Sequence, residues 1–131
     1  MREQNQHEAA RTLWMLGGIA GFLAVALGAF GAHALRSRLS TEMLDIFKTG
    51  VQYQALHALA LLLVALLAER RAGNTLLPWV GWLFTTGIVL FSGSLYGLAI
   101  TGVRILGAIT PLGGICFLAG WALLIASAKR A

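Results

Sequence analysis

Four long apolar runs alternate with short polar segments along the chain. The runs cover 13–35, 50–68, 76–100 and 105–127, and every charged side chain lies outside them. Because a helix rises 1.5 Å per residue, about 20 residues cross the ~30 Å hydrocarbon core of a bilayer. The pattern predicts an all-α integral membrane bundle of four transmembrane helices, forming a single transmembrane domain over residues 1–131.

The polar segments between the runs carry their own signals. Residues 1–12 mix charges of both signs and are expected to form a short tail. Over 40–48, apolar and charged residues alternate with helical spacing, which predicts a short amphipathic interfacial helix between the first two spans, with Ser40 or Thr41 as its N-cap. Pro111 either kinks the fourth span or, with Thr110 as N-cap, begins its regular part.

A cleaved signal peptide is the alternative for the first run. Ala32-His33-Ala34 has the form of a signal-peptidase site, and Arg2 and Arg11 would supply the positive region before it. The apolar run is longer than the 7–15 residues of a signal sequence, however. We therefore expect a retained transmembrane helix.

Composition supports a membrane protein and argues against a nucleic-acid-binding one. Hydrophobic residues make up 58% of the chain and charged residues 11%, whereas globular domains average about 25% charged. The net charge of +5 comes from Lys and Arg residues scattered in ones and twos between apolar runs, not from a basic stripe. The single cysteine, Cys116, allows no intrachain disulfide.

Four spans place both termini on one side of the membrane. Six Lys or Arg residues fall on that side and four on the other, so the positive-inside rule favours cytoplasmic termini. The tryptophans are expected to form an aromatic belt near the terminal side; they are Trp14, Trp79, Trp82 and Trp121.

The first span carries small residues at spacings of four and three, a stripe that favours close helix packing in lipid. The packing residues are Gly17, Gly21, Ala24, Gly28 and Gly31. The pattern leaves open whether the stripe faces a helix of the same chain or of another subunit.

The polar residues within the spans gather in the half of the membrane away from the termini. This candidate polar layer consists of His33, Gln52, Tyr53, Gln54, His57, Ser92, Ser94, Tyr96 and Thr110. Such residues usually face the bundle or a water-filled cavity. They either cross-link neighbouring helices by hydrogen bonds or form a functional site, in which histidine would relay protons or bind a polar ligand.

Enzymatic chemistry is not expected. The chain has no nucleotide-binding glycine loop, HExxH, G-x-S-x-G or Cys-x-x-Cys motif. His33 and His57 alone would make a weak metal site, so no metal or other cofactor is predicted. The spans also lack a carboxylate, the usual coupling residue of an ion-driven transporter.

Five strings identify a resemblance: GAFGAHAL at 28–35, KTGVQYQALHAL at 48–59, LFSGSLYGLA at 90–99, ITPLGG at 109–114 and GW at 120–121. In this order and spacing the chain resembles the domain of unknown function 423 family of small bacterial inner-membrane proteins. The resemblance covers about 17–121 and implies a multi-pass protein of the bacterial inner (plasma) membrane. It carries no catalytic or binding residue.

The leading hypothesis is a structural or accessory protein that contacts the lipid bilayer and forms a homo-oligomer or binds a membrane partner. The alternative is a small channel or transporter for a polar solute or ion, using the layer around His33 and His57. A third possibility is lipid binding by the basic segment 36–48.

Overall fold

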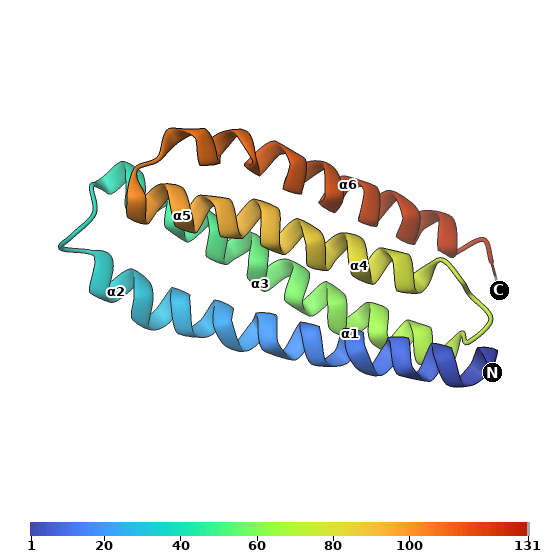
Figure 1. Ribbon diagram of the computed structural model, residues 1–131. Helices are drawn as coiled ribbons and strands as arrows, with labels where there is room; N and C mark the ends of the chain where they lie inside the picture. Colours follow the sequence, from blue (N-terminus) through green and yellow to red (C-terminus); the bar gives the residue numbers. More distant parts are fainter. Residues whose placement is uncertain (131) are drawn as a thin grey trace.

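The computed structural model describes residues 1–130, which form an antiparallel bundle with both termini at one end (Figure 1). Within these residues four helical spans are long and apolar enough to cross a membrane: Arg2–Leu35, Thr41–Arg70, Leu77–Thr101 and Arg104–Ser127. The predicted all-α membrane bundle is confirmed. We call the end with the termini the terminal end and the other the far end.

Three of the spans contain a change of helical pitch. The first consists of α1 (Arg2–Val25), the π-helical η1 (Ala26–Gly31) and α2 (Ala32–Leu35); the second is α3 (Thr41–Arg70) alone. The third consists of α4 (Leu77–Gly87), the π-helical η2 (Ile88–Ser92) and α5 (Gly93–Thr101). The fourth begins with the 3₁₀ turn η3 (Arg104–Ala108) and continues as α6 (Thr110–Ser127).

Two expectations for the polar segments need correction. Residues 2–12 are not a tail but the first three turns of α1, because Ala10 and Leu13 are buried and anchor this helical extension to the bundle. The segment 40–48 is helical and capped by Ser40, whose Oγ accepts from Met43 N at 3.2 Å. It is not a separate interfacial helix, however, because α3 continues through Thr49 and Gly50 without a break.

The order of packing makes α3 the central helix. It pairs with α1 along one side and with α4, η2 and α5 on another, while α6 packs mainly on α4 and η2. Figure 1 shows this succession from α1 through α3 and α4/α5 to α6. Of the four spans, α3 is the most buried and the fourth the least.

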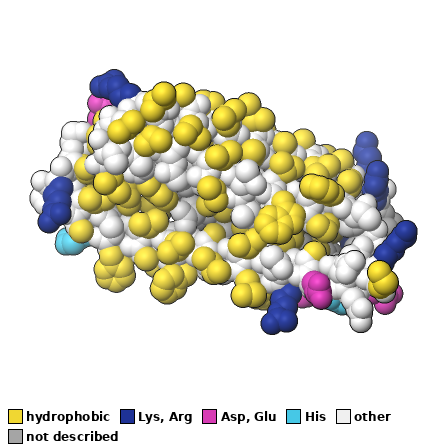
Figure 2. Space-filling model, in the orientation of Figure 1, with side chains coloured by type: hydrophobic (Ala, Val, Ile, Leu, Met, Phe, Trp, Pro, Cys, Tyr) yellow, Lys and Arg dark blue, Asp and Glu magenta, His cyan; other side chains and the backbone are white. Residues whose placement is uncertain are grey.

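The two halves of the bundle have different interiors. The terminal half is filled by an apolar core around Leu13, Leu61, Val64, Val80 and Phe84, all at most 1% exposed. Among the described residues, Gln54, His57, Ser92 and Ser94 are buried from the middle of the bundle towards the far end, and Asn74 and Ser127 are buried at the terminal end. Charged side chains lie at the two ends of the molecule and apolar ones cover the length between them (Figure 2).

Pro111 lies in the first turn of α6, where its missing N–H costs no helical hydrogen bond. The second of the two sequence interpretations is therefore correct about where the helix begins. Thr110 is not its cap, because the Thr110 hydroxyl bonds to Ser94 instead.

Candidate functional site

His57 lies among aromatic rings in the middle of the bundle, 2% exposed. Its imidazole stacks on Phe117 with ring centroids 3.6 Å apart and planes inclined by 9°, and it meets the edge of Phe84 at 5.2 Å. Tyr53, one turn earlier in α3, stacks more distantly on both His57 and Phe117. The imidazole thus joins α3 to α4 and α6.

Both ring nitrogens of His57 have partners. Nδ1 lies 2.7 Å from Tyr53 O, and Trp121 Nε1 donates to His57 Nε2 at 3.1 Å. A carbonyl only accepts and an indole N–H only donates, so these bonds assign the neutral tautomer with the proton on Nδ1. An imidazolium, which carries N–H on both nitrogens, would lose the bond from Trp121.

Gln54 and Tyr96 form a second polar contact, between α1, α3 and α5. Gln54 Nε2 donates to Ala20 O at 2.8 Å, and Tyr96 Oη donates to Gln54 Oε1 at 2.6 Å. Gln54 is only 4% exposed. One glutamine therefore fastens the first span to the third across the central helix.

Two serines, Ser92 at the end of η2 and Ser94 in α5, form hydrogen bonds to neighbouring helices. Ser92 Oγ donates to Gly50 O of α3 at 2.7 Å, and Ser94 Oγ lies 2.6 Å from Thr110 Oγ1 of α6. Ser94 also donates to Phe91 O at 2.9 Å, in the π-helical turn. The region around η2 is therefore linked to both the second and the fourth span.

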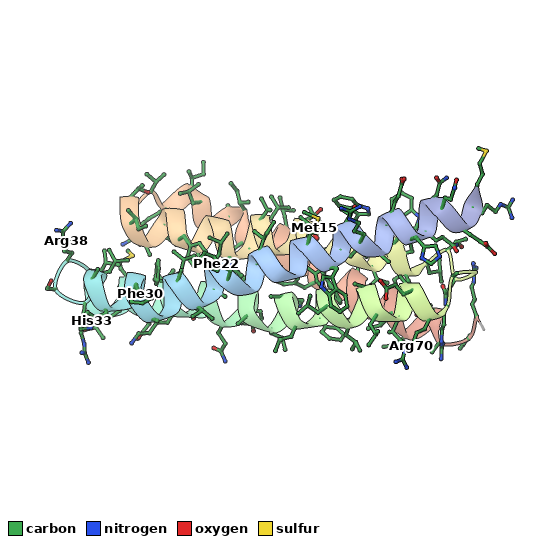
Figure 3. All side chains as sticks on the ribbon, turned by 90° about the horizontal axis from the view of Figure 1, so that it is seen from below. Met15, Phe22, Phe30, His33, Arg38 and Arg70 are labelled. Carbon is green, nitrogen blue, oxygen red and sulfur yellow. The ribbon has the colours of Figure 1, made fainter. Side chains whose placement is uncertain are left out.

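Not every residue of the predicted layer joins this network. Tyr53 is 40% exposed, and Gln52 and His33 are also exposed. His33 lies at the far end of the first span, next to the loop that carries Arg38 (Figure 3). His33 and His57, which the sequence offered only as a weak metal pair, do not come together, since one side chain is at the end of the bundle and the other in its middle. In the part of the chain that the structure describes, no three His, Cys, Asp or Glu side chains gather into a possible metal site.

Sequence reasoning missed two polar residues that the fold uses. Trp121 is not a belt residue on the membrane surface, because it is partly buried and bonded to His57, whereas Trp14, Trp79 and Trp82 are about half exposed or more. Asn74, 3% exposed, donates from Nδ2 to Ser127 O at 2.9 Å and Arg130 O at 3.0 Å. A Gly-Asn pair is typical of a turn and by itself gives no sign of this role.

The predicted small-residue stripe faces α3 of the same chain. A Cβ added at Gly17 would lie 2.9 Å from Leu62 Cδ2, one at Gly28 3.0 Å from Val51 Cγ1, and one at Gly31 3.3 Å from Phe47 Cζ. Gly21 has more room, with Ala58 Cβ at 3.9 Å, and Ala24 is buried. The stripe therefore lets the first span pack closely on α3 of the same chain.

Comparison with known proteins adds the family. The model of a family described as proteins of unknown function, DUF423, matches residues 27–114. The chain belongs to the DUF423 family. The resemblance noted in the sequence is confirmed.

Relatives of this DUF423 protein are similar over most of their length. The UPF0382 membrane protein YwdK of Bacillus subtilis is 50% identical over 116 residues, which cover 88% of this chain and 94% of the relative. The UPF0382 inner membrane protein YgdD of Escherichia coli is 43% identical over 121 residues, 92% of each chain. No solved structure shows significant similarity to the chain.

The region matched to the DUF423 model contains only part of the polar and aromatic network. It includes every residue of the predicted polar layer, but it ends before Phe117 and Trp121. The side chains that stack on and bond to His57 from α6 therefore lie outside it. The protein is a small membrane protein of a family whose activity is uncharacterised.

Proposed function

We propose that this protein is an accessory or structural component of the membrane that works by association rather than by moving a solute. The observation that carries the proposal is the use of its interior polar groups as cross-links between helices. In the described residues, every buried side-chain nitrogen or oxygen has a hydrogen-bond partner within the chain. A translocation site would need polar groups that can exchange their hydrogen-bond partners within the protein for water or solute.

The terminal half gives the proposal its second support. Its core is closed by apolar side chains from all four spans, including Leu13, Leu61, Val80 and Phe117. A polar solute that reached His57 from the far end would meet this core next. No polar route through a single subunit continues past it in the described residues.

Cytoplasmic termini and a non-enzymatic role belong to the same proposal. Six Lys and Arg residues lie at the terminal end and four at the far end, which supports termini inside the cell. The name of the Escherichia coli relative supports the bacterial inner membrane. His57, the best-placed candidate for acid–base chemistry, already uses both nitrogens in bonds to the protein.

Association is proposed for the lipid-facing surface of the first span. Figure 3 looks onto the first span, along which Met15 and Phe22 of α1 and Phe30 of η1 are 57%, 75% and 76% exposed. Such side chains can contact either lipid or a helix of another subunit. Native mass spectrometry from nanodiscs would count the subunits, and a uniform bare monomer would contradict self-association.

Flux through reconstituted liposomes tests the proposal against the channel alternative. We expect vesicles with the wild-type protein to be no more permeable to protons or potassium than protein-free vesicles. His57→Ala should lower thermal stability, and Tyr53→Phe, which keeps the stacked ring, should leave stability nearly unchanged; both should leave this background unchanged. A wild-type flux above background that His57→Ala abolishes would overturn the proposal and establish transport through the polar layer.

A further inference from the structure

A groove on the lipid-facing side separates the first span from the third. It arises because α1 packs closely on α4 near the terminal end, where Leu13 rests on Gly81, while α3 forms the floor between the two spans further along. Its walls come from α1 and from α4, η2 and α5, and its volume is about 410 Å³. From Leu16 of α1 to Leu27 of η1 it follows the first span for about 17 Å.

The groove is apolar except for Gln54 and Tyr96 at its floor and Thr85, whose hydroxyl donates to Gly81 O of its own helix. Aliphatic side chains such as Ile19, Leu23 and Val89 form the walls, and Gln54 and Tyr96 line the bottom. None of the lining residues is an acid, Lys, Arg or His. A charged group at this depth would therefore have no counter-charge, so a resident molecule must be uncharged there.

The floor retains hydrogen-bonding capacity of both kinds. Gln54 Nε2 carries two hydrogens and donates one of them to Ala20 O. The Tyr96 hydroxyl donates to Gln54 Oε1, and its oxygen can still accept. A hydroxyl group both accepts and donates, so one uncharged hydroxyl can accept from Gln54 and donate to the Tyr96 oxygen at once.

We propose that this groove binds a neutral lipid alcohol, with the hydrocarbon chain between α1 and the third span and the hydroxyl on the Gln54 and Tyr96 pair. The size of the groove falls in the usual range for ligand sites, which are mostly apolar with a few placed polar groups. Binding sideways from the membrane requires no passage through the bundle. The site is separate from the His57 cluster and goes beyond the accessory role proposed above.

The chain offers a plug for the groove and a matched control. A Cβ built at Gly93 meets nothing within 4 Å, and Gly93 lines the groove, so Gly93→Leu would fill it without disturbing the packed core. A Cβ at Gly114 of α6 also meets nothing within 4 Å, and this residue does not line the groove. Gly114→Leu thus adds the same side chain to a helix elsewhere.

The experiment is native mass spectrometry of the protein in detergent with added oleyl alcohol, compared with the alkene of equal length that lacks the hydroxyl. We expect the wild type and Gly114→Leu to retain the alcohol in preference to the alkene. Gly93→Leu should lose it by tenfold or more. Tyr96→Phe, which removes only the hydroxyl oxygen, should weaken retention by about fivefold, the effect of one net hydrogen bond.

Three results would overturn the proposal. Equal retention of alcohol and alkene would show that the groove binds hydrocarbon chains without recognising the hydroxyl. Undiminished retention by Gly93→Leu would place the alcohol elsewhere. A wild-type dimer that Gly93→Leu converts to a monomer would assign the groove to a second copy of the chain. Thermal unfolding of Gly93→Leu and Gly114→Leu is measured first, so that retention is compared only between folded proteins.

Discussion

Two adjacent glycines in α6 should respond in opposite directions to the same substitution. A Cβ added at Gly113 would collide with the backbone nitrogen of Phe91 and lie 2.7 Å from its Cα, whereas one at Gly114 meets nothing within 4 Å. The obstacle at Gly113 is main chain and cannot turn aside as a side chain would. Gly113→Ala therefore forces α6 away from η2, but Gly114→Ala does not.

The expected magnitude follows from two opposing effects. Replacing a helical glycine by alanine gains about 1 kcal/mol of helix propensity, and this gain applies to both positions. Overpacking costs about 1–3 kcal/mol, and the backbone collision at Gly113 places it at the upper end. We expect Gly113→Ala to lower the free energy of unfolding by about 2 kcal/mol and Gly114→Ala to raise it by up to about 1 kcal/mol.

The assay is reversible unfolding of both variants and the wild type in the same detergent or bicelle, followed by near-ultraviolet circular dichroism. The sign difference between neighbouring positions removes general effects of composition and detergent. Equal stabilities of Gly113→Ala and Gly114→Ala would refute the close backbone approach of α6 to η2. So would a Gly113→Ala protein more stable than the wild type.

Further substitutions test individual contacts by the same unfolding measurement. Asn74→Ala should cost about 2 kcal/mol, because Ser127 O and Arg130 O lose their shared donor; a change below 0.5 kcal/mol would contradict this role. Gly102→Ala should cost about 1 kcal/mol, since Gly102 has a φ of +72°, and a neutral result would argue against that turn. His33→Ala should be neutral within about 0.5 kcal/mol, as expected of an exposed side chain, whereas a clear loss would place His33 in the network.

Some contacts of the polar layer followed from helix spacing and others did not. Tyr53 and His57 are four residues apart, so their stacking on one face of α3 was foreseeable. The bond from Trp121 to His57 joins residues 64 positions apart. This bond forms only if α6 lies beside α3 and Trp121 is level with His57 along the bundle axis. The periodicity of a single helix specifies neither condition.

The sequence by itself determined the membrane environment, the four spans and the common side of the two termini. These follow from the length and apolarity of each run, because a bilayer accepts only segments that satisfy their own backbone hydrogen bonds. It also indicated that the polar residues would gather away from the terminal end.

Only the tertiary structure decided which of those residues meet, that α3 is central, and that the predicted second span and the segment 40–48 form one helix. It also placed a groove with Gln54 and Tyr96 on its floor between the first and third spans. The physical reason is that helix packing in lipid depends on close fit, such as Gly113 against Phe91, rather than on apolarity, which all four spans share. Fit is a property of two surfaces together, and a single run of sequence describes only one of them.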